Sequence, residues 1–438
     1  MTERGTQVVA GLLMALALAV LLAGFVLADG GSSSTVAPKD PTVMTNAVVR
    51  FFEERVQRDP HDFVSYNRLA GAYVQRARQT GDVADYSRAV AALEASLEAL
   101  PNDNYEALVQ LSLVYGAMHR FSDALALAQQ ALGLKPSEAF GYAVLGDAHV
   151  ALGRYDEAEE AYQRVTAEAP GLSSFSRLAY LLELRGDLET AELMWRNALS
   201  TDSGRRPEST AWARVQLGNF HFNVGEIGPA EEEYERALRT FPDYVHALAG
   251  LAKVQAARAD YDGAASLYEL VVDRYPIPEY VAALGDVHLV AGRSDDAEKQ
   301  YDLVAAIDKL YKASGINTDL QMALFFADHD LNLDEAVRQA RAVYEARPSI
   351  QAADVLAWAL YKSGSYEEVL EYSGEALKLG TQDATMLFHA GMIRHSIGDY
   401  EEARNYLERA IQINPGFSVL YAGTAADTLQ ELQSVVRR

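Results

Sequence analysis

GDYEEARNYLERAIQINP, residues 398–415, shares its pattern and length with GRYDEAEEAYQRVTAEAP at 153–170 and with GEIGPAEEEYERALRTFP at 225–242. Each stretch opens with Gly, places an apolar residue two positions later, continues with Ala and larger apolar residues three or four apart, and closes with Pro. Apolar residues at that spacing form one stripe along an α-helix. Gly suits the turn before the helix, and Pro ends it because proline lacks a backbone N–H. The pattern therefore predicts one amphipathic helix that the chain repeats.

A second helix is expected before each of these stretches. FGYAVLGDAHVALG (140–153), WARVQLGNFHFNVG (212–225) and YVAALGDVHLVAG (280–292) share a Leu-Gly pair. A small residue beside Leu lets another helix approach closely, so we expect Gly146 to face Ala158. The repeating unit is then a helix hairpin of about 34 residues.

This period, with Leu-Gly in the first helix and Ala in the second, resembles the tetratricopeptide repeat. One unit matches the family pattern at Tyr142, Leu145, Gly146, Gly153, Tyr155, Ala158, Tyr162 and Pro170. The last unit matches it at Leu387, Ala390, Gly391, Gly398, Tyr400, Ala403, Leu407, Ala410 and Pro415. One hairpin cannot bury its apolar face alone, whereas stacked neighbours bury it for each other. The resemblance implies an all-α solenoid of about ten stacked helix-turn-helix repeats.

The domain organisation follows from this array. We expect an N-terminal transmembrane anchor or signal segment at 1–28, a flexible linker at 29–42, a capping helix at 43–60, the repeat array at 61–415 and a capping helix at 416–438. Three units depart from the pattern: the first has a longer turn near Gly81, one adds a polar loop at 201–209, and the unit that starts at Pro278 runs on to Gly315.

Composition limits the possible functions. A net charge of −24 over 438 residues argues against nonspecific binding to nucleic acid, so we expect no nucleic-acid partner. The acidity serves either the solubility of a large surface or the attraction of a basic partner. The chain has no Cys, which excludes disulfides, thiolate metal sites and thiol nucleophiles.

The N-terminus contains VVAGLLMALALAVLLAGFVLA at 8–28, a stretch without charge or Pro. A bilayer core needs about 20 helical residues, so Val8–Leu27 is long enough to span it. Because Val26-Leu27-Ala28 offers a small-residue cleavage site, a removed signal is the alternative. The expectation is a single-pass cell-membrane protein with an extracytoplasmic array, or a secreted or periplasmic chain after cleavage.

The sequence contains no phosphate-binding loop, dinucleotide fingerprint, Gly-x-Ser-x-Gly elbow or His-Glu-x-x-His motif, and we expect neither catalysis nor a cofactor. DHDLNLDE at 328–335 alternates acidic residues as a calcium loop does. The calcium pattern requires Gly at the sixth place and Glu at the twelfth, where Leu333 and Gln339 stand. Asp330 to Asp334 are therefore interpreted as turn and capping residues.

The resemblance implies that the first helices of the repeats line a concave groove for a protein partner or an extended peptide. Two groups of residues at groove positions are larger or more polar than the rest. The middle group is Tyr180, Trp212, Asn219, Asn223 and Lys253, and the C-terminal group is Phe325, Trp358, Tyr361, Lys362, Phe388, Met392 and His395. Aromatic side chains suit binding anchors, and polar ones suit hydrogen bonds to a peptide. Alternatively, the aromatics pack between neighbouring repeats. The family's clamp for a C-terminal carboxylate is not supported, because Val215 stands where Lys is required.

Three function classes remain open. The first is a membrane-anchored scaffold for protein–protein interactions in a bacterial-type envelope. The second is a chaperone-like holder of extended clients, of the envelope or cytochrome-maturation type. The third is a noncatalytic subunit that organises an enzyme or transporter complex. The sequence names neither the partner nor the oligomeric state.

Overall fold

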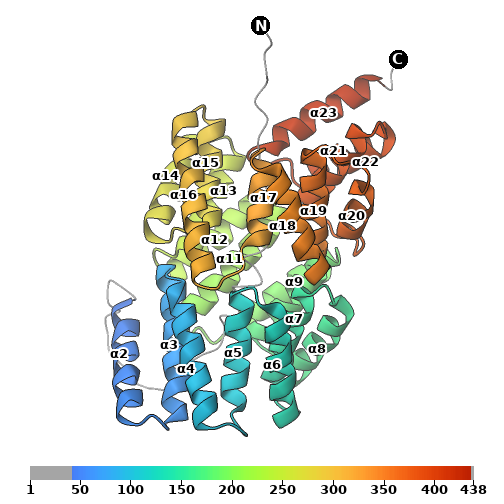
Figure 1. The fold of residues 1–438 in the computed structure, drawn as a ribbon. Coiled ribbons are helices and arrows are strands. Elements are labelled where there is room, and N and C mark those ends of the chain that lie inside the picture. The colour runs from blue at the N-terminus through green and yellow to red at the C-terminus, as the bar shows by residue number, and fades with distance from the viewer. Residues whose placement is uncertain (1–41, 436–438) are drawn as a thin grey trace. The chain divides into compact units, whose positions relative to one another are not determined.

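The structure, a computed structural model, describes residues 42–435, and the segment expected at 8–27 lies outside them. The regular structure of residues 42–435 consists of 22 α-helices, α2 to α23, without strands (Figure 1). The all-α prediction is therefore confirmed for this part of the chain. No helix within it is both long and apolar enough to cross a membrane.

Ten consecutive helix pairs run from α3–α4 to α21–α22, in agreement with the predicted number of repeats. We call the first helix of a pair helix A, the second helix B, the connection inside a pair the A–B turn and the connection to the next pair the B–A turn. The bounds are α2 Thr42–Arg58, α3 Phe63–Thr80, α4 Ala84–Ala99, α5 Tyr105–Ala117, α6 Phe121–Leu134, α7 Ala139–Ala151, α8 Tyr155–Glu168, α9 Leu172–Leu184, α10 Leu188–Ser200, α11 Pro207–Asn223, α12 Ile227–Thr240, α13 Val245–Ala257, α14 Tyr261–Arg274, α15 Pro278–Val290, α16 Ser294–Ala313, α17 Asp319–Asp328, α18 Leu333–Ala346, α19 Ile350–Lys362, α20 Val369–Ala376, α21 Ala384–Ser396, α22 Tyr400–Ile413 and α23 Tyr421–Val435.

The described residues form two compact units. The N-terminal unit comprises residues 42–178 and 309–318, and the C-terminal unit comprises residues 179–308 and 319–435. Of the irregularities expected from the sequence, the extended unit that starts at Pro278 corresponds to α15 and the long helix α16. Helix α16 extends over 20 residues, and α20 is shortened to 8.

The A–B turns need a residue with left-handed backbone geometry. Gly153 and Gly398 supply it with φ of 74° and 83°. Glycine adopts this conformation without the steric penalty that a Cβ brings. The turn after α5 uses His119 instead, with φ of 60°. The left-handed backbone conformation of these turns therefore explains why the sequence has Gly at these positions.

The close approach of the two helices in a pair depends on the Gly of the Leu-Gly motif. A Cβ on Gly218 would lie 2.6 Å from the ring of Tyr234, which is fully buried on α12. Gly146 likewise packs against the ring of Tyr162. The sequence pattern predicts that Gly146 faces Ala158, but the ring of Tyr162, one helical turn further along α8, fills the space. The small residue therefore makes room for a ring rather than for another small residue.

The same tyrosines donate hydrogen bonds to the residue after each Leu-Gly pair. Tyr162 bonds to Asp147 at 2.8 Å, Tyr234 to Asn219 at 2.8 Å and Tyr301 to Asp286 at 3.0 Å, all between oxygen atoms. A buried phenol needs such a partner, because an unpaired buried hydroxyl is destabilising. The same hydrogen bond between helix B and helix A therefore recurs in these three pairs.

Each unit also contains contacts between turns that are far apart in sequence. In the C-terminal unit, a Cβ on Gly225 would meet the backbone of Ile413 and Asn414. The side-chain Nδ2 of Asn414 donates a hydrogen bond of 2.7 Å to the Phe222 carbonyl oxygen. In the N-terminal unit, the Asn317 backbone N–H donates to the Met118 carbonyl oxygen at 3.2 Å. In each case an A–B turn packs against a later B–A turn.

Candidate functional site

All twelve residues predicted to bind a partner belong to the C-terminal unit and lie on A helices. The buried ones are Tyr180, Trp212, Phe325, Trp358, Phe388 and Met392. Those that keep some accessible surface are Asn219, Asn223, Lys253, Tyr361, Lys362 and His395. The large apolar side chains are thus packed in the interior, which agrees with the alternative that they lie between repeats. The polar ones remain as candidates for contact with a partner.

Trp358 on α19 is the centre of the buried aromatic group. Its side chain is 2% exposed, and its ring stacks on that of His389 from α21, with centroids 4.1 Å apart and an interplanar angle of 13°. The indole Nε1 donates a hydrogen bond of 2.8 Å to Oδ1 of Asp328. Phe388 packs beside it at 5.8 Å between ring centroids. Neighbouring A helices therefore meet through these rings.

Two histidine–carboxylate pairs lie around this aromatic group. His389 Nδ1 is 3.0 Å from Oδ2 of Asp354, and His329 Nε2 is 3.0 Å from Oδ1 of Asp286. His329 also donates from Nδ1 to the Phe325 carbonyl oxygen, so both of its ring nitrogens are engaged. Pairing of this kind is what allows charged groups to be buried.

The pKa values follow from burial and from these neighbours. Burial raises the pKa of Asp328 to about 6, although His389 and His329 act in the opposite direction. For His389, burial acts to lower the pKa, but the charges of Asp354 and Asp328 and the hydrogen bond with Asp354 outweigh it, so the pKa is raised. Asp328 Oδ2 and His389 Nε2 are buried and have no hydrogen-bond partner within the described residues. The pKa of Asp328 is thus closer to neutral pH than that of an ordinary aspartate.

Sequence reasoning missed this network for an identifiable reason. It did not single out His389 as a site residue, and it considered Asp328 only as a possible ligand in the calcium pattern. The signal that was available is the presence of acidic residues at groove-facing positions, such as Asp286, Asp328 and Asp354, beside aromatics. Within residues 42–435, no group of three or more His, Asp or Glu side chains is arranged to hold a metal ion.

Lys253 on α13 has a different environment. Its Nζ lies 4.5 Å from the centroid of the Phe222 ring on α11, a cation–π contact. The side chain is half-buried, and burial lowers the pKa of Lys253 to about 8. No carboxylate within the described residues raises it again. Asn223, which follows Phe222, is exposed. A half-buried ammonium group without an anionic partner is thus placed beside an aromatic ring and an exposed amide.

The remaining polar candidates have partners inside the chain. Asn219 accepts the hydrogen bond from Tyr234 described above. Lys362 pairs with Asp330, with Nζ 2.8 Å from Oδ1. Tyr361 stacks on Trp358 with ring centroids 4.9 Å apart, and His395 contacts the ring of Tyr400 at 5.6 Å. Of the polar candidates, Lys253 and Asn223 are therefore the most available to a partner.

Comparison with known proteins supports the repeat assignment. A family model described as tetratricopeptide repeat matches residues 109–173, 144–199, 215–276 and 260–311, and a second model of that description matches 384–417. Together the two models match about half of the chain.

Similarity to individual proteins is more distant. The heat shock protein STI1 of Saccharomyces cerevisiae is 23% identical over 355 residues, which cover 78% of this chain and 54% of that protein. The Hsp70-Hsp90 organizing protein of Triticum aestivum is 40% identical over 72 residues, which cover 16% of this chain and 12% of that protein. The chain spans about half the length of the yeast protein. Yeast Tom70 is similar in structure with a TM-score of 0.38 and 13% identity, over 91% of this chain and 94% of that chain.

Proposed function

Because this chain belongs to the tetratricopeptide repeat family, we propose that it is a noncatalytic scaffold that binds segments of partner proteins on helix A of its repeats. The observation that carries the proposal is the position of Lys253 over Phe222, without an anionic partner inside the chain. Burying an unpaired charge is destabilising. A partner that places a carboxylate or a backbone carbonyl group against this ammonium group removes that penalty.

The proposed contact combines three kinds of interaction. Lys253 binds an oxygen of the partner, and Asn223 exchanges hydrogen bonds with the partner's backbone. The Phe222 ring holds the lysine ammonium group in place through the cation–π contact. Truncating a residue that anchors an interface commonly weakens binding by about 2 kcal/mol or more, which is a factor of about 30. The neutral variant Lys253→Met keeps most of the stem and removes the charge.

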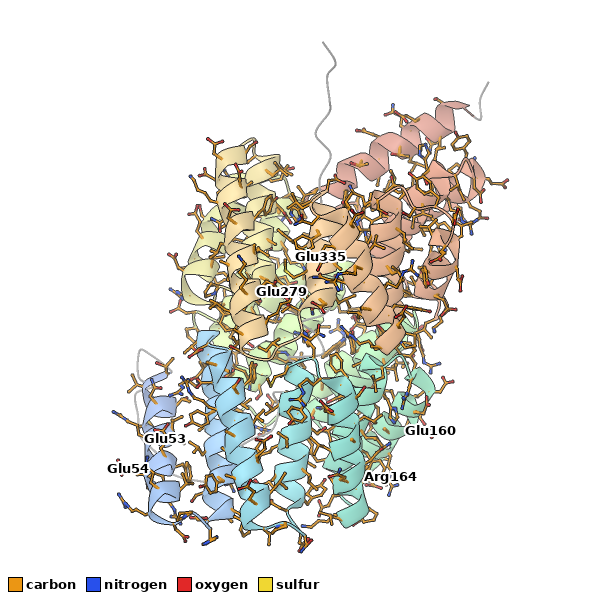
Figure 2. The ribbon with its side chains drawn as sticks, viewed as in Figure 1. Glu53, Glu54, Glu160, Arg164, Glu279 and Glu335 are labelled. Atoms are coloured by element: carbon orange, nitrogen blue, oxygen red, sulfur yellow. The ribbon has the colours of Figure 1, made fainter. Side chains whose placement is uncertain are left out.

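The experiment is affinity purification of the full chain from native membranes, followed by mass spectrometry. Partner recovery should fall by about 30-fold in Lys253→Met if this residue is an anchor. Glu160→Ala, on helix B of a pair in the N-terminal unit, is the control and should leave recovery unchanged (Figure 2). Equal recovery with Lys253→Met, with an unchanged melting temperature, contradicts the proposed site.

A membrane attachment is part of the proposal. The apolar stretch at 8–27 holds the chain at a membrane with the array on the extracytoplasmic side, and its uncharged length is the supporting observation. The full chain should then resist carbonate extraction, and protease added to spheroplasts should digest the array. A soluble mature chain that starts at Asp29 favours the cleaved signal instead.

A chaperone-like holder of extended clients is the second candidate. It is supported by the names of two relatives, a heat shock protein and an Hsp70-Hsp90 organizing protein. Peptides with a free C-terminal carboxylate and the same peptides with an amide end distinguish the two functions. Because Val215 occupies the position of the clamp lysine, we expect equal binding of both forms. Co-purification of one stoichiometric partner favours a third function, that of an organising subunit.

A further inference from the structure

The A–B turns of the early pairs and those of the late pairs differ in what covers them. The turn after α5 is covered by the B–A turn between α16 and α17, where Asn317 bonds to Met118 and Ile316 joins the same apolar core. The turn after α11 is covered by the B–A turn between α22 and α23 through Asn414. The turn after α9 is covered similarly, because a Cβ on Gly186 would meet the Gly380 carbonyl group. Contact between an A–B turn and a B–A turn is therefore a recurring interface inside this chain.

The last three A–B turns have apolar side chains on the surface instead. These residues, which we call the C-terminal edge, are Leu331, Tyr366, Leu370, Ile397 and Tyr400. Tyr366 and Tyr400 are 45% and 49% exposed. Because they lie in the turns of α17–α18, α19–α20 and α21–α22 or at the start of the helix that follows, they belong to the same side of three consecutive pairs.

Two residues at equivalent positions show how a later B–A turn reduces the exposure of an apolar side chain. Met118 and Ile397 are both the C-cap residue of a helix A, α5 in the first case and α21 in the second. Met118 lies under the later B–A turn and is 4% exposed, whereas Ile397 is 40% exposed. The chain thus has apolar residues at both equivalent positions but covers only one of them.

In the first two pairs, the helix ends on the side opposite to the A–B turns also have exposed side chains. Val64 at the start of α3, Leu134 at the end of α6 and Ser137 in the turn after α6 are exposed, and we call them the N-terminal edge. In the B–A turns that cover an A–B turn, Ile316 and Asn414 are buried. Each copy of the chain therefore has a free A–B edge in its last pairs and a free B–A edge in its first pairs.

We propose that the C-terminal edge of one copy binds the N-terminal edge of a second copy, in a head-to-tail contact that repeats the turn-to-turn packing found inside each unit. The two edges are different surfaces, so the contact is heterologous and leaves one free edge at each end of the assembly. Growth continues until another molecule occupies an edge or the contact closes a ring. This self-association is independent of the partner site at Lys253.

The absence of Cys allows a direct test by crosslinking of single-cysteine variants. Ser396→Cys places a thiol beside Ile397, and Ser137→Cys places one on the N-terminal edge; both serines are exposed. The full chain is kept in detergent so that the apolar stretch at 8–28 does not drive association. A short bismaleimide should link Ser396→Cys to Ser137→Cys in a mixture and should link neither variant to itself. Ser266→Cys, exposed on α14, replaces Ser396→Cys in the control mixture and should give only background.

Sedimentation of the full chain in detergent gives the second readout. Mass should grow with concentration beyond a dimer, and Tyr366→Lys on the C-terminal edge should weaken association by about tenfold or more. Leu134→Lys on the other edge should do the same, and a mixture of the two variants should stop at a dimer. A monomer at every concentration, a wild-type assembly that stops at two copies, or crosslinking of Ser396→Cys to itself overturns the proposal.

Discussion

The side-chain amide of Asn414 is hydrogen-bonded to the carbonyl oxygen of Phe222, 192 residues earlier in the chain, at 2.7 Å. Asn414 is 1% exposed, and its Oδ1 accepts a second hydrogen bond from the Gly416 backbone N–H at 2.9 Å. A side chain at the end of α22 therefore serves as a cap for the end of α11.

Replacing Asn414 with Ala should loosen this turn. The Phe222 carbonyl oxygen loses its side-chain donor but keeps the bond from the Gly225 backbone N–H at 3.0 Å. The expected cost is therefore that of one hydrogen bond, about 0.5–1.5 kcal/mol. Hydrogen exchange should accelerate at residues 224–227 and remain unchanged in α3. Gln412→Ala, an exposed neighbour on α22, is the control. No change at the turn contradicts the assigned role of the amide.

Two glycines should respond in opposite ways to a methyl group. Gly218→Ala forces the ring of Tyr234 to move and should lower the free energy of unfolding by about 1–3 kcal/mol. Gly133 on α6 has no atom near the place of a new Cβ, so Gly133→Ala should be neutral or stabilise the helix by about 0.5–1 kcal/mol. Urea denaturation measures both, and equal effects argue against the packing described for Tyr234.

Trp358 should contribute to stability rather than to binding. Trp358→Ala removes a buried ring and leaves Asp328 without its indole donor, so we expect a loss of about 3–5 kcal/mol. Trp358→Phe retains most of the packing and isolates the missing hydrogen bond. Thermal unfolding distinguishes these cases, and a melting temperature unchanged by Trp358→Ala reverses the conclusion in favour of a binding anchor.

The stability of the C-terminal unit should decrease as pH rises from about 4 to about 6. Burial raises the pKa of both Asp328 and Asp383 to about 6. Between about pH 4 and pH 6 the folded state therefore binds more protons than the unfolded state, whose carboxyl groups titrate near pH 4, and stability falls with rising pH. The raised pKa of His389 has the same sign and extends the effect above its ordinary range.

Asp328→Asn tests this dependence because it keeps an oxygen for the Trp358 indole. The variant should reduce the pH-dependent change in unfolding free energy by about 1–3 kcal/mol. Denaturation curves at several pH values measure it. His149 and His288 titrate with the opposite sign, since burial lowers the pKa of each, so the difference between variant and wild type is the quantity to compare. If the unfolding free energy of the variant changes with pH by the same amount as that of the wild type, the role of Asp328 is contradicted.

The buried ion pair of Arg177 and Asp147 gives a prediction for the N-terminal unit. Both side chains are almost fully buried and form two hydrogen bonds of 2.8 and 2.9 Å. Removing one partner leaves a buried charge, so Arg177→Met should cost about 3–5 kcal/mol. Adding Asp147→Leu should recover part of that loss, because the second change removes the stranded charge. If the effects of Arg177→Met and Asp147→Leu on the free energy of unfolding are simply additive, the two side chains do not interact and the prediction is wrong.

Much of the fold was predictable because its determinants are local. Gly398, Ala403 and Pro415 occupy the same places in one repeat as Gly153, Ala158 and Pro170 do in another, and each place has the same steric demand. Helix packing between sequence neighbours follows from that pattern. The Leu-Gly pair predicted a close helix approach correctly, although the ring of Tyr162 was not foreseen as its partner.

The burial of the candidate groove residues was decided by tertiary structure. Sequence position placed Trp358 and Phe388 on the helices expected to line a groove, but the A helices meet so closely that these rings fill the space between them. Exposure depends on the angle and distance between helices, which the period of a repeat leaves open. The repeat pattern does not predict the hydrogen bond from Asn414 to Phe222 either. The two residues are 192 positions apart, and their turns come into contact only in the folded chain. The sequence thus determined the repeating unit, and only the three-dimensional packing determined which surfaces of that unit remain free.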